Sequence, residues 1–204
     1  MRSKFVTPSR PRARRARATA VVLVAALLGT VATYVVVAQL NAAETSAAPP
    51  PGTAQGPLGD DDGYIETGSS ISPFADDLPA IAKLDPALRD AMHAAATAAL
   101  ADGFEFVVTS GWRSERYQQA LFDDAVLEYG SAEEAGRRVA SPTTSAHVTG
   151  KAVDVGFTDA NSWLSQHGAD YGLCQIYTNE MWHFELATTP GGECPPQLPD
   201  ASYR

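Results

Sequence analysis

The stretch Ser145–Asp154, SAHVTGKAVD, places His147 and Asp154 seven positions apart, with Gly150 between them. Glycine adopts left-handed backbone conformations that other residues avoid, so the chain can turn back between the two polar residues. The segment 152–155 is short, apolar and β-branched, which predicts a buried strand. The sequence therefore predicts that an imidazole and a carboxylate are brought together at one strand.

A second motif, Glu180-Met181-Trp182-His183, supplies another histidine with a glutamate three residues before it. Two imidazoles and one carboxylate provide the three protein ligands of a typical catalytic zinc site, which leaves one position open for water. Zinc lowers the pKa of that water and so supplies a nucleophile. We therefore expect one Zn²⁺ per chain on His147, Asp154 and His183, with Glu180 as the general base.

The remaining pattern predicts an α+β domain with a small antiparallel sheet and flanking helices. Asp85 and Pro86 mark the start of a helix that ends at Gly103. Further helices are expected at 114–129, from Ser131, and at 159–167; strands are expected at 104–109, 152–155, 173–177 and 182–186. The short link between the last two strands predicts an antiparallel pair. His93 and His167 are interpreted as structural residues.

The amino-terminal region predicts a membrane anchor. Residues 1–18 form a basic head with seven of the 15 basic residues of the chain, and residues 19–40 carry no charge. About 20 apolar residues span a bilayer as a helix, and the preceding arginines predict a cytoplasmic amino terminus. A cleaved signal peptide is the alternative. In both cases the rest of the chain lies outside the cytoplasm, and we expect a single-pass protein of the cell membrane.

Residues 41–73 predict a flexible linker, because they are rich in proline, glycine and acidic residues and show no apolar period. The run Asp60–Asp62 lacks the ligand spacing of a calcium loop. The folded catalytic domain is expected at 74–204.

The charge distribution argues against nucleic acid as a partner. After residue 17 the chain has eight basic and 24 acidic residues, a formal net charge of −16. Nucleic-acid binding depends on neutralising phosphates with basic residues.

Cys174 and Cys194 are the two cysteines of the chain. An oxidising compartment favours a disulfide between them. Two buried free thiols are the alternative.

Three blocks together resemble one family. SAHVTGKAVD is similar to the S-x-H-x-x-G-x-A-x-D signature of VanY-type D-alanyl-D-alanine carboxypeptidases, and NEMWHFE is similar to their E-x-W-H motif. SGWRSERYQ, residues 110–118, resembles a third block, S-[AG]-[YW]-R-S-x-x-x-Q. The blocks occur in the family's order and cover roughly residues 105 to 186.

The resemblance implies the zinc DD-peptidase fold, shared with the hedgehog amino-terminal domain, and the zinc ligands and base given above. It implies that Arg113 contacts the substrate and stabilises the charge that develops on the scissile carbonyl, consistent with the planar set of donors on a guanidinium. It also implies that Gln118 and Ser145 help to hold the terminal D-residue. The substrate it implies is a peptidoglycan stem peptide ending in D-Ala-D-Ala.

The approach to the first ligand departs from the family pattern. Many relatives carry P-G-x-S-E-H, whereas this chain has Pro142-Thr143-Thr144-Ser145-Ala146-His147. An L,D-carboxypeptidase or an endopeptidase acting on peptidoglycan is therefore an alternative. A wall-binding module that keeps zinc without catalysis, and an Fe(II) facial-triad oxygenase, are the two further alternatives.

Overall fold

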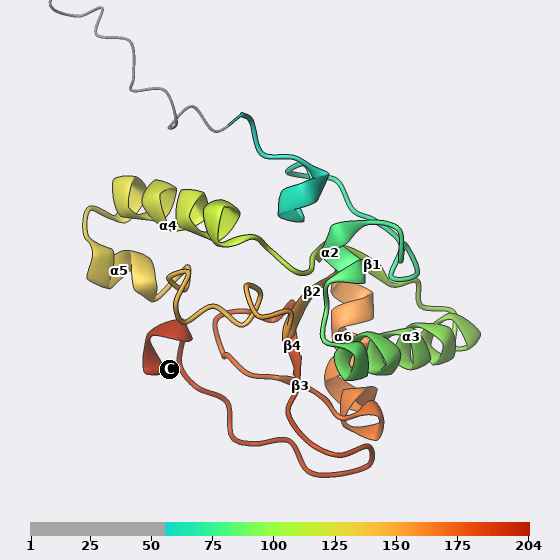
Figure 1. Cartoon of the computed structure of the whole chain (residues 1–204). Coiled ribbons are helices and arrows are strands. Elements are labelled where there is room, and N and C mark those ends of the chain that lie inside the picture. Colours follow the sequence, from blue (N-terminus) through green and yellow to red (C-terminus); the bar gives the residue numbers. More distant parts are fainter. Residues whose placement is uncertain (1–55) are drawn as a thin grey trace, which may run out of the picture. The chain divides into compact units, whose positions relative to one another are not determined.

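A four-stranded antiparallel sheet carries the middle of the fold, with the strands in the order β1-β2-β4-β3. The structure, a computed structural model, describes residues 56–204 (Figure 1). The strands are β1 (Val107–Ser110), β2 (Ala152–Gly156), β3 (Leu173–Gln175) and β4 (His183–Leu186). The predicted α+β class, the small antiparallel sheet and the pairing of β3 with β4 are confirmed.

The helices are α2 (Pro79–Ala82), α3 (Pro86–Ala101), α4 (Glu115–Tyr129), α5 (Ala132–Gly136) and α6 (Thr158–His167), with short 3-10 turns at Asp60–Asp62, Gly168–Tyr171 and Ala201–Tyr203. The predicted start of α3 is confirmed, because the Asp85 carboxylate accepts a hydrogen bond from the amide of Ala87 at 2.9 Å. The strand predicted from residue 104 begins at Val107 instead. The amide of Phe104 donates to the carbonyl of Ala99, so this residue takes part in the C-terminal cap of α3.

The two faces of the sheet carry different kinds of residue. Val153 and Val155 of β2 and Phe184 of β4 lie in the hydrophobic core with α3 and α6. Because successive side chains of a strand point to opposite faces, Asp154 and His183 project from the other face, where they are paired across the strands. In Figure 1, α3 and α6 lie on one side of the strands and α4 and α5 on the other. The helices α3 and α6 therefore cover the apolar face of the sheet, and the opposite face carries the polar residues.

Residues 57–73 form an arm that packs against the domain, which corrects the predicted boundary at residue 74. Asp62 is buried and paired with the guanidinium of Arg116, and it accepts a hydrogen bond from Ser114 at 2.8 Å. Ile71 exchanges two backbone hydrogen bonds of 2.9 Å with Val108. The local composition of the arm is that of a linker. Its order comes from long-range contacts with α4 and β1, which local composition does not reveal.

The predicted anchor at 19–40, the basic head and the linker residues 41–55 lie outside the described residues. Among residues 56–204, no helix has the length and apolar character needed to span a bilayer.

The Asp62–Arg116 pair predicts a pH-dependent contribution to stability. Hydrogen bonds from Arg116 and Ser114 outweigh burial and lower the pKa of Asp62 below 3.8. Asp62→Asn should lower the free energy of unfolding at neutral pH by about 1–3 kcal/mol. A folded-state pKa below the unfolded value stabilises the protein above the unfolded pKa. The deficit should therefore shrink as the pH falls through the lowered pKa.

Denaturant unfolding at several pH values measures this difference. Asp61→Asn is the matched control, because Asp61 is exposed in the same turn. Equal stability of the two variants at neutral pH would contradict the assigned role of Asp62.

Candidate metal centre and active site

His147 is positioned by the tight loop that precedes β2. Gly150 has a φ of 69°, and a Cβ atom at this position would overlap the backbone carbonyl of Lys83. The carbonyl of Gly150 accepts a hydrogen bond of 2.8 Å from the amide of Asp85, just before α3. The expected turn at Gly150 is therefore present, and the loop is anchored to the core helix.

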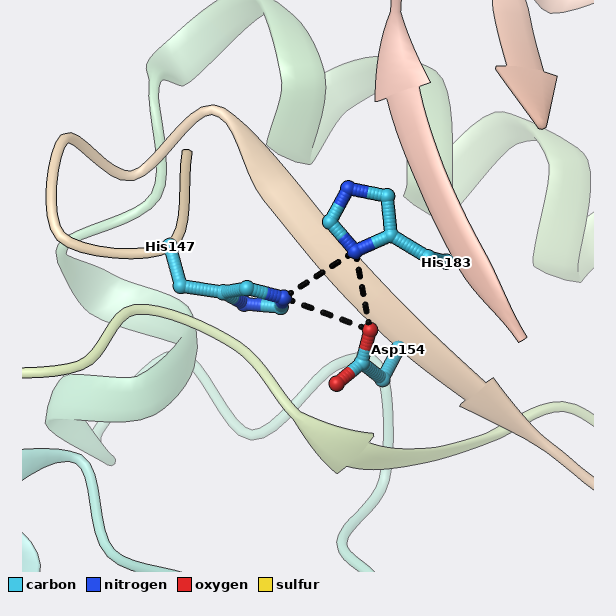
Figure 2. A group of neighbouring side chains, drawn as sticks. All are labelled: His147, Asp154 and His183. Carbon is cyan, nitrogen blue, oxygen red and sulfur yellow. Dashed lines mark hydrogen bonds and ion pairs between the residues drawn. The ribbon is translucent and has the colours of Figure 1, made fainter. Parts of the chain in front are cut away.

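The side chains of His147, Asp154 and His183 converge on one point (Figure 2). The Nε2 atom of His147 lies 3.2 Å from Nδ1 of His183, and each of these nitrogens lies 3.3 Å from Oδ1 of Asp154. All three side chains are buried, and their candidate ligand atoms lie within 4.8 Å of one another. The structure thus brings together the three ligands predicted from the sequence.

The hydrogen bonds around these residues suit a metal ion. Oδ1 of Asp154 is buried and accepts no hydrogen bond, which is unfavourable unless a cation completes its environment. His147 donates from Nδ1 to the carbonyl of Gly111 at 2.8 Å, and His183 donates from Nε2 to Glu185 at 3.0 Å. Since carbonyls and carboxylates only accept, the converging nitrogens of both neutral rings carry lone pairs. The donor set therefore fits Zn²⁺.

The protonation equilibria of the three residues are strongly coupled. Burial, reinforced by the charge of Arg113, lowers the pKa of His147. Burial opposes ionisation of Asp154 and of His183, but the surrounding charges and hydrogen bonds outweigh it. They hold the pKa of Asp154 well below 3.8 and raise that of His183 to about 9. A proton and a metal ion would thus compete for this cluster.

Arg113 is fixed beside the ligands by three hydrogen bonds. Its Nη2 donates to Oδ2 of Asp154 at 2.8 Å, its Nε to Ser110 at 2.7 Å and its Nη1 to Gln118 at 3.1 Å. A guanidinium has five N–H donors, so one proton on each Nη remains for a substrate. Arg113 lines the same cavity as the three candidate ligands.

Gln118 lines the same cavity and is also held by partners within the protein. Its side chain is 1% exposed and bridges Arg113 to the carbonyl of Ala140. The side chain positions Arg113, because its oxygen and its amide nitrogen each have a partner within the protein. Ser145 is also buried, and it lines the same cavity as Gln118.

Glu180 and the three candidate metal ligands line one cavity of about 220 Å³. One carboxylate oxygen of Glu180 lies 3.6 Å from Nδ1 of His183. Burial raises the pKa of Glu180 above 4.5, which improves a carboxylate as a proton acceptor near neutral pH. Trp182 also lines this cavity.

Some residues around the site were not predicted. Ser110 holds Arg113, and Glu185 holds His183 while it accepts a hydrogen bond of 2.6 Å from Arg204. Glu185 could have been found from the strand alternation, because it lies two residues after His183 and shares its face. No sequence pattern indicates a role for Arg204, because its contact with Glu185 depends on how the C-terminal segment folds back onto the domain.

The predicted disulfide between Cys174 and Cys194 is present. It joins β3 to the segment that leads to the turn Ala201–Tyr203, next to the cavity. His93, interpreted as structural, hydrogen-bonds with the carbonyl of Pro73, and the ring of His167 packs on that of Trp163.

Comparison with known proteins agrees with this geometry. The family model described as VanY, D-alanyl-D-alanine carboxypeptidase, matches residues 81–189, which is more than half of the chain. The chain belongs to the VanY family. A D-alanyl-D-alanine carboxypeptidase of Enterococcus faecalis is 32% identical to it over 127 residues, which cover 50% of this chain and 46% of the relative. This VanY-family chain thus matches less than half the length of that relative.

Solved structures similar to this VanY-family chain include two peptidases. A mutant of the vancomycin-resistance D,D-pentapeptidase VanY in complex with Zn(II) is 27% identical, with a TM-score of 0.48 over 53% of this chain and 73% of that one. The L,D-carboxypeptidase DacB of Streptococcus pneumoniae is 30% identical, with a TM-score of 0.42 over 53% of this chain and 67% of that one.

The Glu185–Arg204 contact predicts that residues behind His183 tune metal affinity. Glu185→Ala should weaken zinc binding by about 10–100-fold, because His183 loses the partner that fixes its orientation. Arg204→Ala should have a smaller effect in the same direction. Competition with a chromophoric chelator measures both dissociation constants.

Arg89→Ala is the control, since Arg89 pairs with the exposed Asp76 on the surface. A folded Glu185→Ala protein with wild-type zinc affinity would show that this contact does not act on the metal site.

Proposed function

We propose that the chain is a zinc-dependent D-alanyl-D-alanine carboxypeptidase that hydrolyses the C-terminal peptide bond of peptidoglycan stem peptides. The convergence of three ligand atoms with Glu180 and Arg113 at one cavity carries this proposal. Membership of the VanY family supports it. The same arrangement disfavours a wall-binding module, because a purely structural zinc site needs neither a desolvated carboxylate nor a guanidinium beside an open position.

His147, Asp154 and His183 would hold the zinc ion. When bound there, zinc activates a water molecule and polarises the scissile carbonyl. Glu180 accepts the proton of the attacking water and passes it to the leaving amine, since its raised pKa suits both transfers. Arg113 donates its remaining N–H groups to the carbonyl oxygen as negative charge develops there. Gln118 and Ser110 keep the guanidinium in place for this step.

The cavity beside Glu180 suits the leaving residue. Glu180 must deliver its proton to the amine of that residue, and the cavity that it lines has about 220 Å³. Ser145 and Ala146 contribute to the wall of this cavity, where relatives often carry a glutamate before the first ligand. A small wall residue at position 146 leaves room for a D-alanine with its carboxylate.

The defining experiment measures release of D-alanine from a peptide ending in D-Ala-D-Ala by the zinc-loaded chain. Glu180→Gln should lower kcat/KM by about 10²–10⁴-fold, because it removes the proton acceptor but keeps the shape of the side chain. Its zinc affinity should stay close to that of the wild type. Unchanged release by Glu180→Gln would refute the proposed base.

Parallel assays distinguish the related activities. Mass spectrometry of muropeptides reports which bond is cut: loss of D-alanine from a tetrapeptide identifies an L,D-carboxypeptidase, and loss of cross-linked dimers identifies an endopeptidase. Tight binding to peptidoglycan without turnover identifies a wall-binding module. Oxygen consumption with iron bound identifies an oxygenase.

We also propose that the domain acts outside the cytoplasm and is held to the membrane through residues 19–40. The Cys174–Cys194 disulfide supports an oxidising location. An external protease should digest the domain on intact cells, and the chain should remain with membranes after an alkaline wash. Release into the medium would identify a cleaved signal peptide, and full protection from the protease would refute the location.

A further inference from the structure

A second cavity, of about 390 Å³, shares part of its lining with the first, but Glu180 does not line it. Four residues line both cavities, namely Arg113, Leu121, Asp154 and Trp182. The two cavities therefore form one groove that passes the metal ligands. If the leaving residue occupies the first cavity, where Glu180 lies, the acyl part of the substrate must extend into the second.

The arm forms one wall of this second cavity. Its lining includes the six consecutive residues Ile65–Ser70, opposite residues of β1 and α4. The arm is held on both sides of this wall. Ile71 is hydrogen-bonded to Val108, and the ring of Tyr64 packs edge-on against that of Tyr117 with centroids 5.4 Å apart. The wall is thus a fixed surface, and it lies outside the matched VanY region, which begins at residue 81.

We propose that the second cavity binds the acyl side of the peptide substrate and that Glu66 selects a substrate with a cationic side chain there. This inference rests on the proposed function for the direction of the peptide. The arm then determines specificity for the residue that precedes the terminal D-Ala-D-Ala unit.

Charge complementarity identifies the favoured side chain. Three charged residues line the second cavity: Glu66, Arg113 and Asp154. Arg113 and Asp154 form an ion pair of 2.8 Å with each other, whereas Glu66 is exposed and carries no ion pair among the described residues. The cavity therefore presents one uncompensated carboxylate to its occupant. A primary ammonium on a flexible stem can reach such a carboxylate while remaining partly hydrated.

Trp182 and Phe157 provide the apolar part of the same cavity. Both side chains are exposed, 44% and 59% respectively, and both line it. Such aromatic surface can contact the aliphatic stem of a lysine-like residue. The cavity thus combines apolar surface for the stem with a carboxylate for the terminal amine.

A pair of tripeptides tests the charge preference. Nα-acetyl-lysyl-D-Ala-D-Ala and its norleucine analogue have similar stems and differ in the terminal ammonium. The wild-type chain should favour the lysine peptide by about two- to fivefold in kcat/KM, as expected for a solvent-accessible ion pair. In Glu66→Gln this ratio should fall to about one, and in Glu66→Lys it should invert. Glu105→Gln is the matched control, since Glu105 is exposed and does not line the groove.

A second variant tests the groove itself. Thr67→Trp introduces a large side chain into the arm wall and should lower kcat/KM for both peptides by tenfold or more through a higher KM. Ser165→Trp, at an exposed position of α6, is its control. A ratio that stays the same in all Glu66 variants would overturn the charge selection. Wild-type kinetics in Thr67→Trp would overturn the groove.

Binding of the same peptides to zinc-loaded Glu180→Gln, measured by calorimetry, separates this inference from the proposed function. The wild type could release no D-alanine, while the Glu180→Gln protein binds the lysine peptide more tightly than its analogue and loses this preference when Glu66→Gln is added. The groove would then stand, and the proposed reaction would be wrong. If D-alanine is released but neither rates nor affinities respond to Glu66, the reaction stands and the inference is wrong.

Discussion

The burial of Asp154 is the constraint on which the rest of the site depends. A carboxylate 6% exposed needs compensation for its lost hydration, and the fold surrounds it with cationic and polar partners. Arg113 contacts one of its oxygens, while the two histidine nitrogens face the other. The oxygen shared by the histidines accepts no hydrogen bond. This environment favours binding of a metal cation, because a cation would interact with that oxygen and with the two imidazole lone pairs at the same time.

Two segments outside the matched VanY region complete this environment. The arm is fixed by Asp62 and Ile71, and it forms a wall of the groove beside Arg113. The tail is fixed by the disulfide, and it brings Arg204 to the glutamate behind His183. The VanY core thus supplies the three candidate ligands, the proposed base Glu180 and the guanidinium of Arg113. The arm lines the second cavity, and the tail supports the candidate ligand His183 through Glu185.

The sequence predicted the centre of the site better than its surroundings. His147, Asp154 and His183 belong to short motifs with fixed spacing, so their convergence could be predicted from strand alternation and one glycine turn. The arm at 57–73 could not be predicted, since its glycine-rich and acidic composition is that of a linker. Its order comes from a buried ion pair with Arg116, more than 50 residues away in the chain. Gln118 was linked to the substrate by resemblance, and the structure adds that it lines the first cavity and bridges Arg113 to Ala140.

The sequence by itself determined the α+β class and the caps of the main helices, and it pointed to the three candidate ligands and to Glu180 as the proposed base. These features depend on local spacing and on side-chain chemistry, both of which can be read along the chain. Only the tertiary structure decided how Arg113 is held, which residues support His183 and what encloses the groove. Those features depend on contacts between segments that are distant in sequence. Such contacts form because buried charges must find partners, and sequence patterns do not identify those partners in advance.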